Sequence, residues 1–170
     1  MPVQALKIQA NGSERGWSSL TGGVFGFDTV DDSDAVSHDA ATSYLTLPQS
    51  KRVSFPVFLQ AEGIRPQSLT VNVVAQRGGA SHPLMRIGFL RGSQLGFDAV
   101  LFDPPATWTL AQRTFATNPI TLAAWTVDDL LGLELCIEND STVGTNDVTL
   151  MSGSVTYSPL TNWQWPSISV

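Results

Sequence analysis

The sequence contains one cysteine and two lysines among its 170 residues, and only 14% of its residues are charged. An average globular protein carries about 25% charged residues, so this chain has an unusually uncharged surface, as is often found where partners cover part of it. The single cysteine, Cys136, excludes an internal disulfide, and the fold does not depend on an oxidising compartment. A formal net charge of -6 without clustered cations argues against direct nucleic-acid binding.

Long hydrophobic runs are also lacking. No apolar stretch approaches the roughly 20 residues of a membrane span, and the N-terminus has no charged region followed by an apolar one. We therefore expect a soluble protein without a membrane partner, synthesised in the cytoplasm. The length suits one well-buried domain better than two.

What the sequence does contain is alternation of apolar and polar residues, which is typical of half-buried strands. Turn signals separate these segments at intervals of about 8–12 residues, and helical periodicity is almost absent. We therefore predict an all-β fold, a single antiparallel β-sandwich of jelly-roll type over residues 44–158. The expected strands are Tyr44 to Leu47, Val53 to Leu59, Leu69 to Val73, Met85 to Phe89, Phe97 to Phe102, Thr107 to Phe115, Leu131 to Ile137 and Val148 to Tyr157, the last with a bulge at Gly153.

The two ends of the chain look less like a folded domain. Residues 1–43 are expected to form an extended N-terminal segment, in which Val3 to Ile8 is either a first strand or an arm, followed by an exposed acidic loop from Asp28 to Asp39. Residues 159–170 form a tail with Trp163 and Trp165. These two side chains need an apolar environment, either on their own sandwich or on a neighbouring molecule.

The stretch from Asn118 to Ile137 has the most internal order. Pro119 favours an extended Asn118, Trp125 adds a large apolar surface, and Thr126 is a suitable N-cap for one helical turn that carries Asp128 and Asp129. The alternation that begins at Leu131 then predicts a core strand. We interpret this stretch as a corner of the sandwich that Trp125 closes.

Metal binding and catalysis have little support. Asp28, Asp31, Asp32 and Asp34 lack the glycine and glutamate spacing of a calcium loop, and a solvated acidic loop is the better interpretation. His38 and His82, the two histidines, show no metal-ligand spacing.

Candidate nucleophiles and acids fail in the same way. No serine occupies a nucleophile elbow, and no glycine-rich phosphate loop with a lysine is present. Glu134 and Glu138 share a strand face about 13 Å apart, too far for a glycosidase pair. We expect no catalytic residue, no metal and no cofactor.

Exposed aromatic side chains can stack on sugar rings, and Trp108, Trp163 and Trp165 are candidates for that role. Packing in a core or an interface is the competing interpretation, because large apolar side chains are usually buried.

One segment resembles a known family. Phe115 to Pro119, Ala124 to Leu130, the strand Leu133 to Ile137 and the closing strand Val148 to Tyr157 are similar to a pattern that recurs in β-sandwich proteins of tailed-bacteriophage particles. The chain departs from that pattern at Ile120 to Leu122, where the family often has a glycine-containing turn.

This resemblance implies a non-enzymatic virion protein, and best a capsid decoration (cement) protein that bridges subunits on the capsid surface. Its partner would be the major capsid protein, and it would assemble as a homotrimer. The implied contact residues are Trp17, Asn118, Pro119, Trp125, Trp163 and Trp165. The alternative is a carbohydrate- or receptor-binding module of a tail or fibre.

Overall fold

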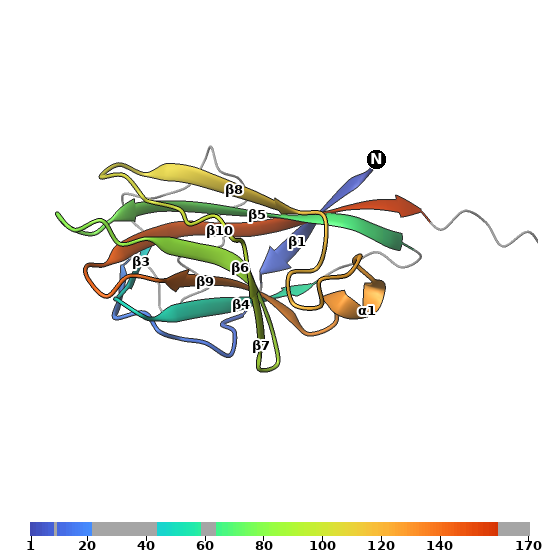
Figure 1. Cartoon of the computed structure of the whole chain (residues 1–170), viewed down its shortest axis with the longest axis horizontal. Helices are drawn as coiled ribbons and strands as arrows, with labels where there is room; N and C mark the ends of the chain where they lie inside the picture. Colours follow the sequence, from blue (N-terminus) through green and yellow to red (C-terminus); the bar gives the residue numbers. More distant parts are fainter. Residues whose placement is uncertain (9, 22–43, 59–63, 160–170) are drawn as a thin grey trace, which may run out of the picture.

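The computed structural model describes residues 1–8, 10–21, 44–58 and 64–159. In that part of the chain the fold is a β-sandwich of two antiparallel sheets, as the alternation predicts (Figure 1). The elements are β1 (Val3–Ile8), β2 (Ser19–Thr21), β3 (Tyr44–Leu47), β4 (Arg52–Phe58), β5 (Ile64–Arg77), β6 (Met85–Arg91), β7 (Gln94–Phe97), β8 (Thr109–Phe115), α1 (Val127–Leu130), β9 (Leu133–Asn139) and β10 (Asn146–Pro159).

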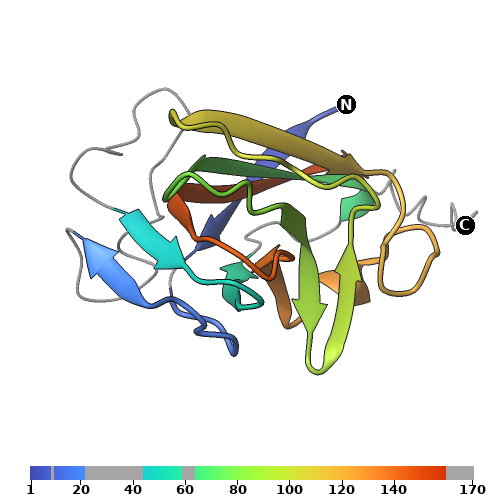
Figure 2. The same ribbon diagram turned by 60° about the vertical axis from the view of Figure 1, so that its left-hand side comes forward.

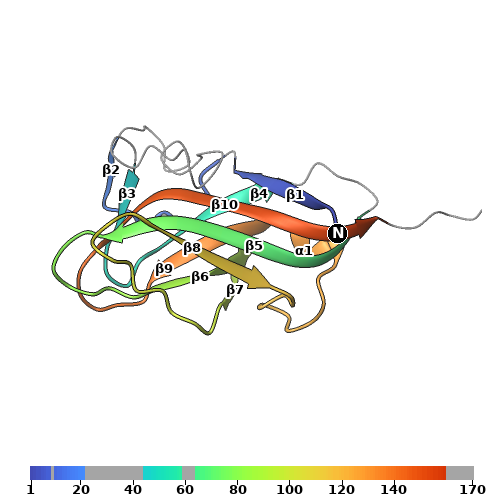
Figure 3. The ribbon, with the colours of Figure 1, turned by 90° about the horizontal axis from the view of Figure 1, so that it is seen from above.

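Each sheet has a simple strand order. The first, here called sheet I, runs β2-β3-β10-β5-β8, and the second, sheet II, runs β4-β9-β6-β7. The long strands β5 and β10 pair along nearly their whole length and form the backbone of sheet I. Seen from above, they run side by side through the length of the molecule (Figure 3). Within the described residues, no helix has the length and hydrophobicity needed to cross a membrane, and α1 is a single turn.

Strand β1 belongs to both sheets. Its residues Val3–Leu6 pair with β10 in sheet I, and Lys7 and Ile8 pair with β4 in sheet II. The following segment continues along β4, where the Gly12 and Gly16 N–H groups donate to the carbonyls of Ser54 and Arg52. The start of the chain is therefore part of the sandwich rather than a free arm.

The core lies between the sheets and follows the predicted alternation. Val53, Phe55 and Val57 of β4 point inward, and so do the alternate residues of β9 that face them. Branched and aromatic side chains fit this arrangement because they pack well on a pleated surface. Burial of such a side chain contributes roughly 1.5–3 kcal/mol, so this interior supplies most of the stability.

Trp125 fills one end of this core, as the sequence indicates. Its side chain is 3% exposed, its indole packs edge-to-face on Phe89 at 5.3 Å, and its Nε1–H donates to the Phe115 carbonyl at 2.9 Å. The predicted helical turn follows as α1. Thr126 caps it through a reciprocal capping box with Asp129.

Three local predictions were wrong. The continuous strand Phe97 to Phe102 does not form. The chain turns at Gly92, which has a positive φ of 59°, and the returning strand β7 ends at Phe97. Beyond it, Phe102 forms an isolated bridge with Met85. The register of β10 against β5 shifts between Val148 and Leu150 and again between Thr156 and Tyr157, but not at Gly153, which stays in register.

The third error concerns Leu131, which was assigned to the inner row of β9. Its side chain is 64% exposed, because it ends α1 and precedes Gly132, whose φ is 68°. A positive φ reorients the chain, so the inward alternation starts only at Leu133.

Candidate functional site

The outer face of sheet I carries rows of uncharged polar side chains. In one row Gln112, Asn72 and Ser152 lie opposite one another on β8, β5 and β10. The Gln112 Nε2 donates to Asn72 Oδ1 at 2.8 Å, and Asn72 Nδ2 donates to Ser152 Oγ at 3.4 Å. Because outward rows repeat every second residue, the next row lies about 7 Å further along the strands.

That next row consists of hydroxyl groups. Thr114 and Thr70 face each other with their oxygens 3.0 Å apart, and Ser154 pairs with Thr70 on the other side. Gln112 and Thr114 are exposed, and the more central residues are half-buried. We call these two rows the neutral face; it consists of Gln112, Asn72, Ser152, Thr114, Thr70 and Ser154.

An aromatic pair borders the neutral face. Tyr44 precedes the inward Leu45 on β3, and Trp108 precedes Thr109, which pairs with the inward Ala75, so both rings point outward. Their centroids are 5.8 Å apart. Since β10 and β5 separate the strands that carry them, the two rings must lean toward each other above these central strands.

An apolar row joins the aromatic pair to the neutral face. Leu150, Val74 and Leu110 lie opposite one another; Leu150 and Val74 are buried, and Leu110, at 45% exposure, is the member of this row that a ligand can contact. A ligand along the strands would therefore meet aromatic rings, then an aliphatic edge, then amides, then hydroxyls. Both Asn and Gln amides offer donors and an acceptor, and hydroxyls offer both, so this order suits a ligand with apolar and hydroxyl-bearing faces.

The electrostatics of this surface are weak. The neutral face holds no titratable side chain, and Asp147 beside it accepts hydrogen bonds from Thr46 at 2.8 Å and from Gln76 at 3.4 Å. Since none of the six residues of the neutral face is a cation, an anionic polymer would gain no charge pairing with them.

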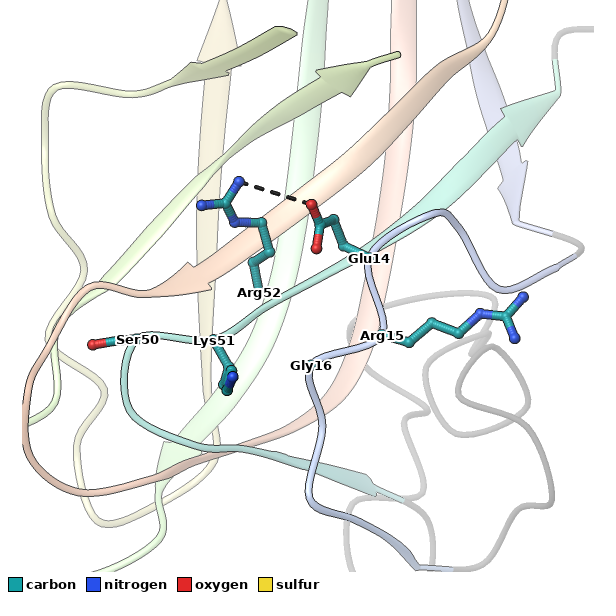
Figure 4. Close-up of a pocket in the computed structure, with 6 residues that line it drawn as sticks. All are labelled: Glu14, Arg15, Gly16, Ser50, Lys51 and Arg52. Atoms are coloured by element: carbon teal, nitrogen blue, oxygen red, sulfur yellow. Dashed lines mark ion pairs between the residues drawn. The ribbon is translucent and has the colours of Figure 1, made fainter. Parts of the chain in front are cut away.

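A polar hollow of about 460 Å³ lies elsewhere, between residues 14–16 and 50–52. It is rich in cations, with Arg15, Lys51 and Arg52. Figure 4 shows, however, that Arg15 and Lys51 point away from each other and that Arg52 is directed to Glu14. The charged groups do not converge on a point, so the hollow lacks the arrangement of an anion site.

The outer face of sheet II is ionic and already satisfied. Arg52 pairs with Glu138 at 3.0 Å, and the Glu134 carboxylate accepts hydrogen bonds from Ser13 and Ser54. As expected from their spacing, the two glutamates share this outer face. Burial raises the pKa of the Cys136 thiol between them, which keeps it protonated and chemically inert.

The predicted contact residues are scattered. Asn118 is fully buried, and its backbone and side chain organise the loop by accepting hydrogen bonds from Leu122 and Ile120. Trp125 is likewise inside the core, so in this conformation a partner can contact neither side chain. Trp17 packs partly buried against the core, and Pro119 is half-buried. Trp163 and Trp165 lie outside the described residues.

Among the described residues, no group of three or more His, Cys, Asp or Glu side chains could hold a metal ion. The acidic cluster from Asp28 to Asp34 and His38 fall outside that part of the chain. His82 contacts Arg77 and, at 3.4 Å, Asp103 at the exposed edge of the sandwich.

No family model matches the sequence, and no curated protein matches it. The chain is similar in fold to the C-terminal CBM6 of LamC, a marine laminarinase from Zobellia galactanivorans, at 7% identity, with 91% of this chain and 100% of that chain covered and a TM-score of 0.49. It is similar to the carbohydrate-binding module CBM6cm-2 of Cellvibrio mixtus lichenase 5A, in complex with cellotriose, at 12% identity, 92% and 98% coverage and a TM-score of 0.47.

A third similar structure is the Stig cyclase Fisc from Fischerella sp. TAU, at 11% identity, 91% and 100% coverage and a TM-score of 0.39. These scores are all below 0.5, and the group contains an enzyme beside binding modules, so no function is transferred from them. None of the three is described as a phage or capsid protein.

Sequence reasoning named Trp108 as a candidate but did not identify the neutral face. Each of its residues is an ordinary outward residue of its own strand, and only the strand register brings β8, β5 and β10 into rows. The available signal was compositional: Ser, Thr, Asn and Gln, without a charged side chain, occupy alternate positions at 70 and 72, at 112 and 114, and at 152 and 154.

Proposed function

We propose that this protein is a non-catalytic glycan-binding protein, whose ligand is an uncharged polysaccharide bound on the outer face of sheet I. The observation that carries the proposal is that the Tyr44–Trp108 pair and the amide row of Gln112 and Asn72 lie on the same outer face, with one apolar row between them. A sugar ring has an apolar C–H face and a rim of hydroxyls. Aromatic rings accommodate the first, and amide groups bind the second.

The form of the surface favours a polymer over a free sugar. Ligand pockets for small molecules are concave and enclose most of their ligand. This site instead extends along the strands over several rows, and neither the polar hollow at residues 14–16 nor the groove near α1 lies on it. Affinity must then come from many weak contacts along one chain, each hydrogen bond contributing about 0.5–1.5 kcal/mol.

Affinity electrophoresis of the full chain through gels that contain neutral polysaccharides, such as β-glucans, mannans and xylans, tests the proposal. We expect retardation by at least one of them. Trp108→Ala and Gln112→Ala should each weaken binding, the second by about 3- to 10-fold because it removes one or two hydrogen bonds. Thr142→Ala, an exposed residue in the loop after β9, is the matched control and should bind normally.

Uronic-acid polymers serve as the charged comparison and should not retard the chain. Equal binding by the Gln112→Ala, Trp108→Ala and control variants would show that the glycan sits elsewhere. Absence of retardation by every neutral polysaccharide would refute the function itself.

A capsid decoration role, with the major capsid protein as partner and a homotrimer on the virion surface, stands as the second proposal. One observation favours it: Leu122, at the tip of the loop after Asn118, is 82% exposed and has a positive φ of 59°. A branched apolar side chain held in a strained, exposed conformation suits a contact surface. Electron microscopy of purified virions tests this role, and absence of the protein from the particles would refute it.

A further inference from the structure

An apolar groove of about 380 Å³ lies between the end of β4 and helix α1. Its floor is buried and consists of Val57, Leu130 and Leu133, while Phe58, Val127 and Leu131 stand at its rim with 44–64% of their surfaces exposed. Isolated exposed apolar residues are common, but three around one concave apolar floor mark a contact site. The groove is independent of the neutral face, which lies on the other sheet.

The described chain ends at the same end of the sandwich as this groove. Pro159, the last residue of β10, pairs with Ile64, the first residue of β5, and α1 contacts β5. Figures 1 and 3 both show α1 and the end of β10 at the same end of the sandwich. Six positions separate Phe58, at the rim of the groove, from Ile64. Six positions likewise separate Trp165 from Pro159, the strand partner of Ile64. The chain beyond Pro159 is therefore long enough to reach the groove.

The composition of residues 160–170, LTNWQWPSISV, matches the groove. The segment contains no charged side chain, and it holds two of the five tryptophans of the protein. A buried tryptophan removes roughly 150–250 Å² from water, which is a large gain for so short a segment. Since the groove offers no charged side chain among its lining residues, neither component would lose a solvated charge on contact.

We propose that this groove is the docking site for the C-terminal segment of the same chain, with an indole of Trp163 or Trp165 between the rim residues Phe58 and Leu131. Docking within one molecule is favoured over docking between two, because the short connection to Pro159 holds the tail at a high effective concentration. The proposal does not depend on glycan binding or on a virion location.

Disulfide trapping in the full chain tests it. Gln164→Cys, between the two tryptophans, is combined with Leu131→Cys at the rim. Under mild oxidation, this pair should form an intramolecular disulfide about tenfold faster than Gln164→Cys combined with Val3→Cys. Val3 is the stringent control, since it is 62% exposed and pairs with Thr156, close to where the tail begins. The native Cys136 is buried and does not compete.

A second comparison separates docking from simple proximity. Adding Trp163→Ala and Trp165→Ala to the Leu131→Cys pair should reduce its rate to that of the Val3 control. Non-reducing electrophoresis reports the product. Equal rates for the two pairs, no effect of the tryptophan substitutions, or a product that is mainly a covalent dimer would each overturn docking within the chain. If Leu131→Cys folds poorly, Val127→Cys takes its place as the rim variant, and the same comparison applies.

Discussion

Replacement of Trp125 by alanine is expected to cost more stability than any other tryptophan substitution in the described chain. The side chain is 3% exposed and packs edge-to-face on Phe89 at one end of the core. Truncation of a buried aromatic residue to alanine costs about 3–5 kcal/mol. The change also leaves the Phe115 carbonyl without its indole donor, which places the expected loss at the upper end of that range, about 4–5 kcal/mol.

The measurement is chemical unfolding in urea, followed by far-UV circular dichroism because the substitution removes a fluorophore. Trp125→Phe is the graded control: it keeps an aromatic ring near Phe89 but loses the hydrogen bond, so about 1–3 kcal/mol should be lost. Trp108→Ala, on the outer face, should cost less than either. A loss below about 1 kcal/mol for Trp125→Ala would show that the core is not closed by this residue.

Three further predictions concern other parts of the fold. Burial raises the pKa of Cys136 above its ordinary value of 9.0, so the thiol of the unfolded chain loses its proton first as the pH rises. The free energy of unfolding should therefore fall above pH 9 by up to about 1.4 kcal/mol per pH unit. Cys136→Ala should remove this dependence on pH. Gly12→Ala would press a methyl group into the Ser54 carbonyl and should lower the urea midpoint, whereas Gly79→Ala, which meets nothing within 4 Å, should leave it unchanged. Thr126→Ala removes the N-cap of α1 and should cost about 1 kcal/mol by the same measurement, while Thr126→Ser should retain most of it.

Much of the fold could be predicted from the sequence because many of its strands have one apolar face. Val53, Phe55 and Val57 face the core and alternate with residues on the other side of the strand. This period of two determines which face of the strand is buried. Trp125 and the cap at Thr126 were predicted for a similar reason, since each depends on neighbours within a few positions. The same local logic failed between Phe97 and Phe102, where an apolar run lies in a loop and only Phe102 bridges to β6.

The candidate site was harder to predict because it is not local. Gln112 and Asn72 are forty positions apart in the chain, and their hydrogen bond exists only because β8 and β5 pair in one particular register. The irregularity at Thr149 has a similar origin. It shifts β10 by one residue relative to β5 and turns Leu150 outward, so that an apolar row appears beside the amides. No pattern within a single strand specifies such a shift.

The pairing of β1 with β10 has a mechanical consequence. These strands are antiparallel neighbours, Val3 lies opposite Thr156, and the Tyr157 N–H donates to the Pro2 carbonyl. Figure 2 shows the N-terminus at the end of the sandwich where β10 finishes. A force that pulls Met1 and Pro159 apart would therefore load the β1–β10 hydrogen bonds one pair at a time. A molecule that is pulled from both ends would lose these hydrogen bonds in sequence, starting from the pair nearest the two ends. A molecule that is held by one end alone would carry no force through its core.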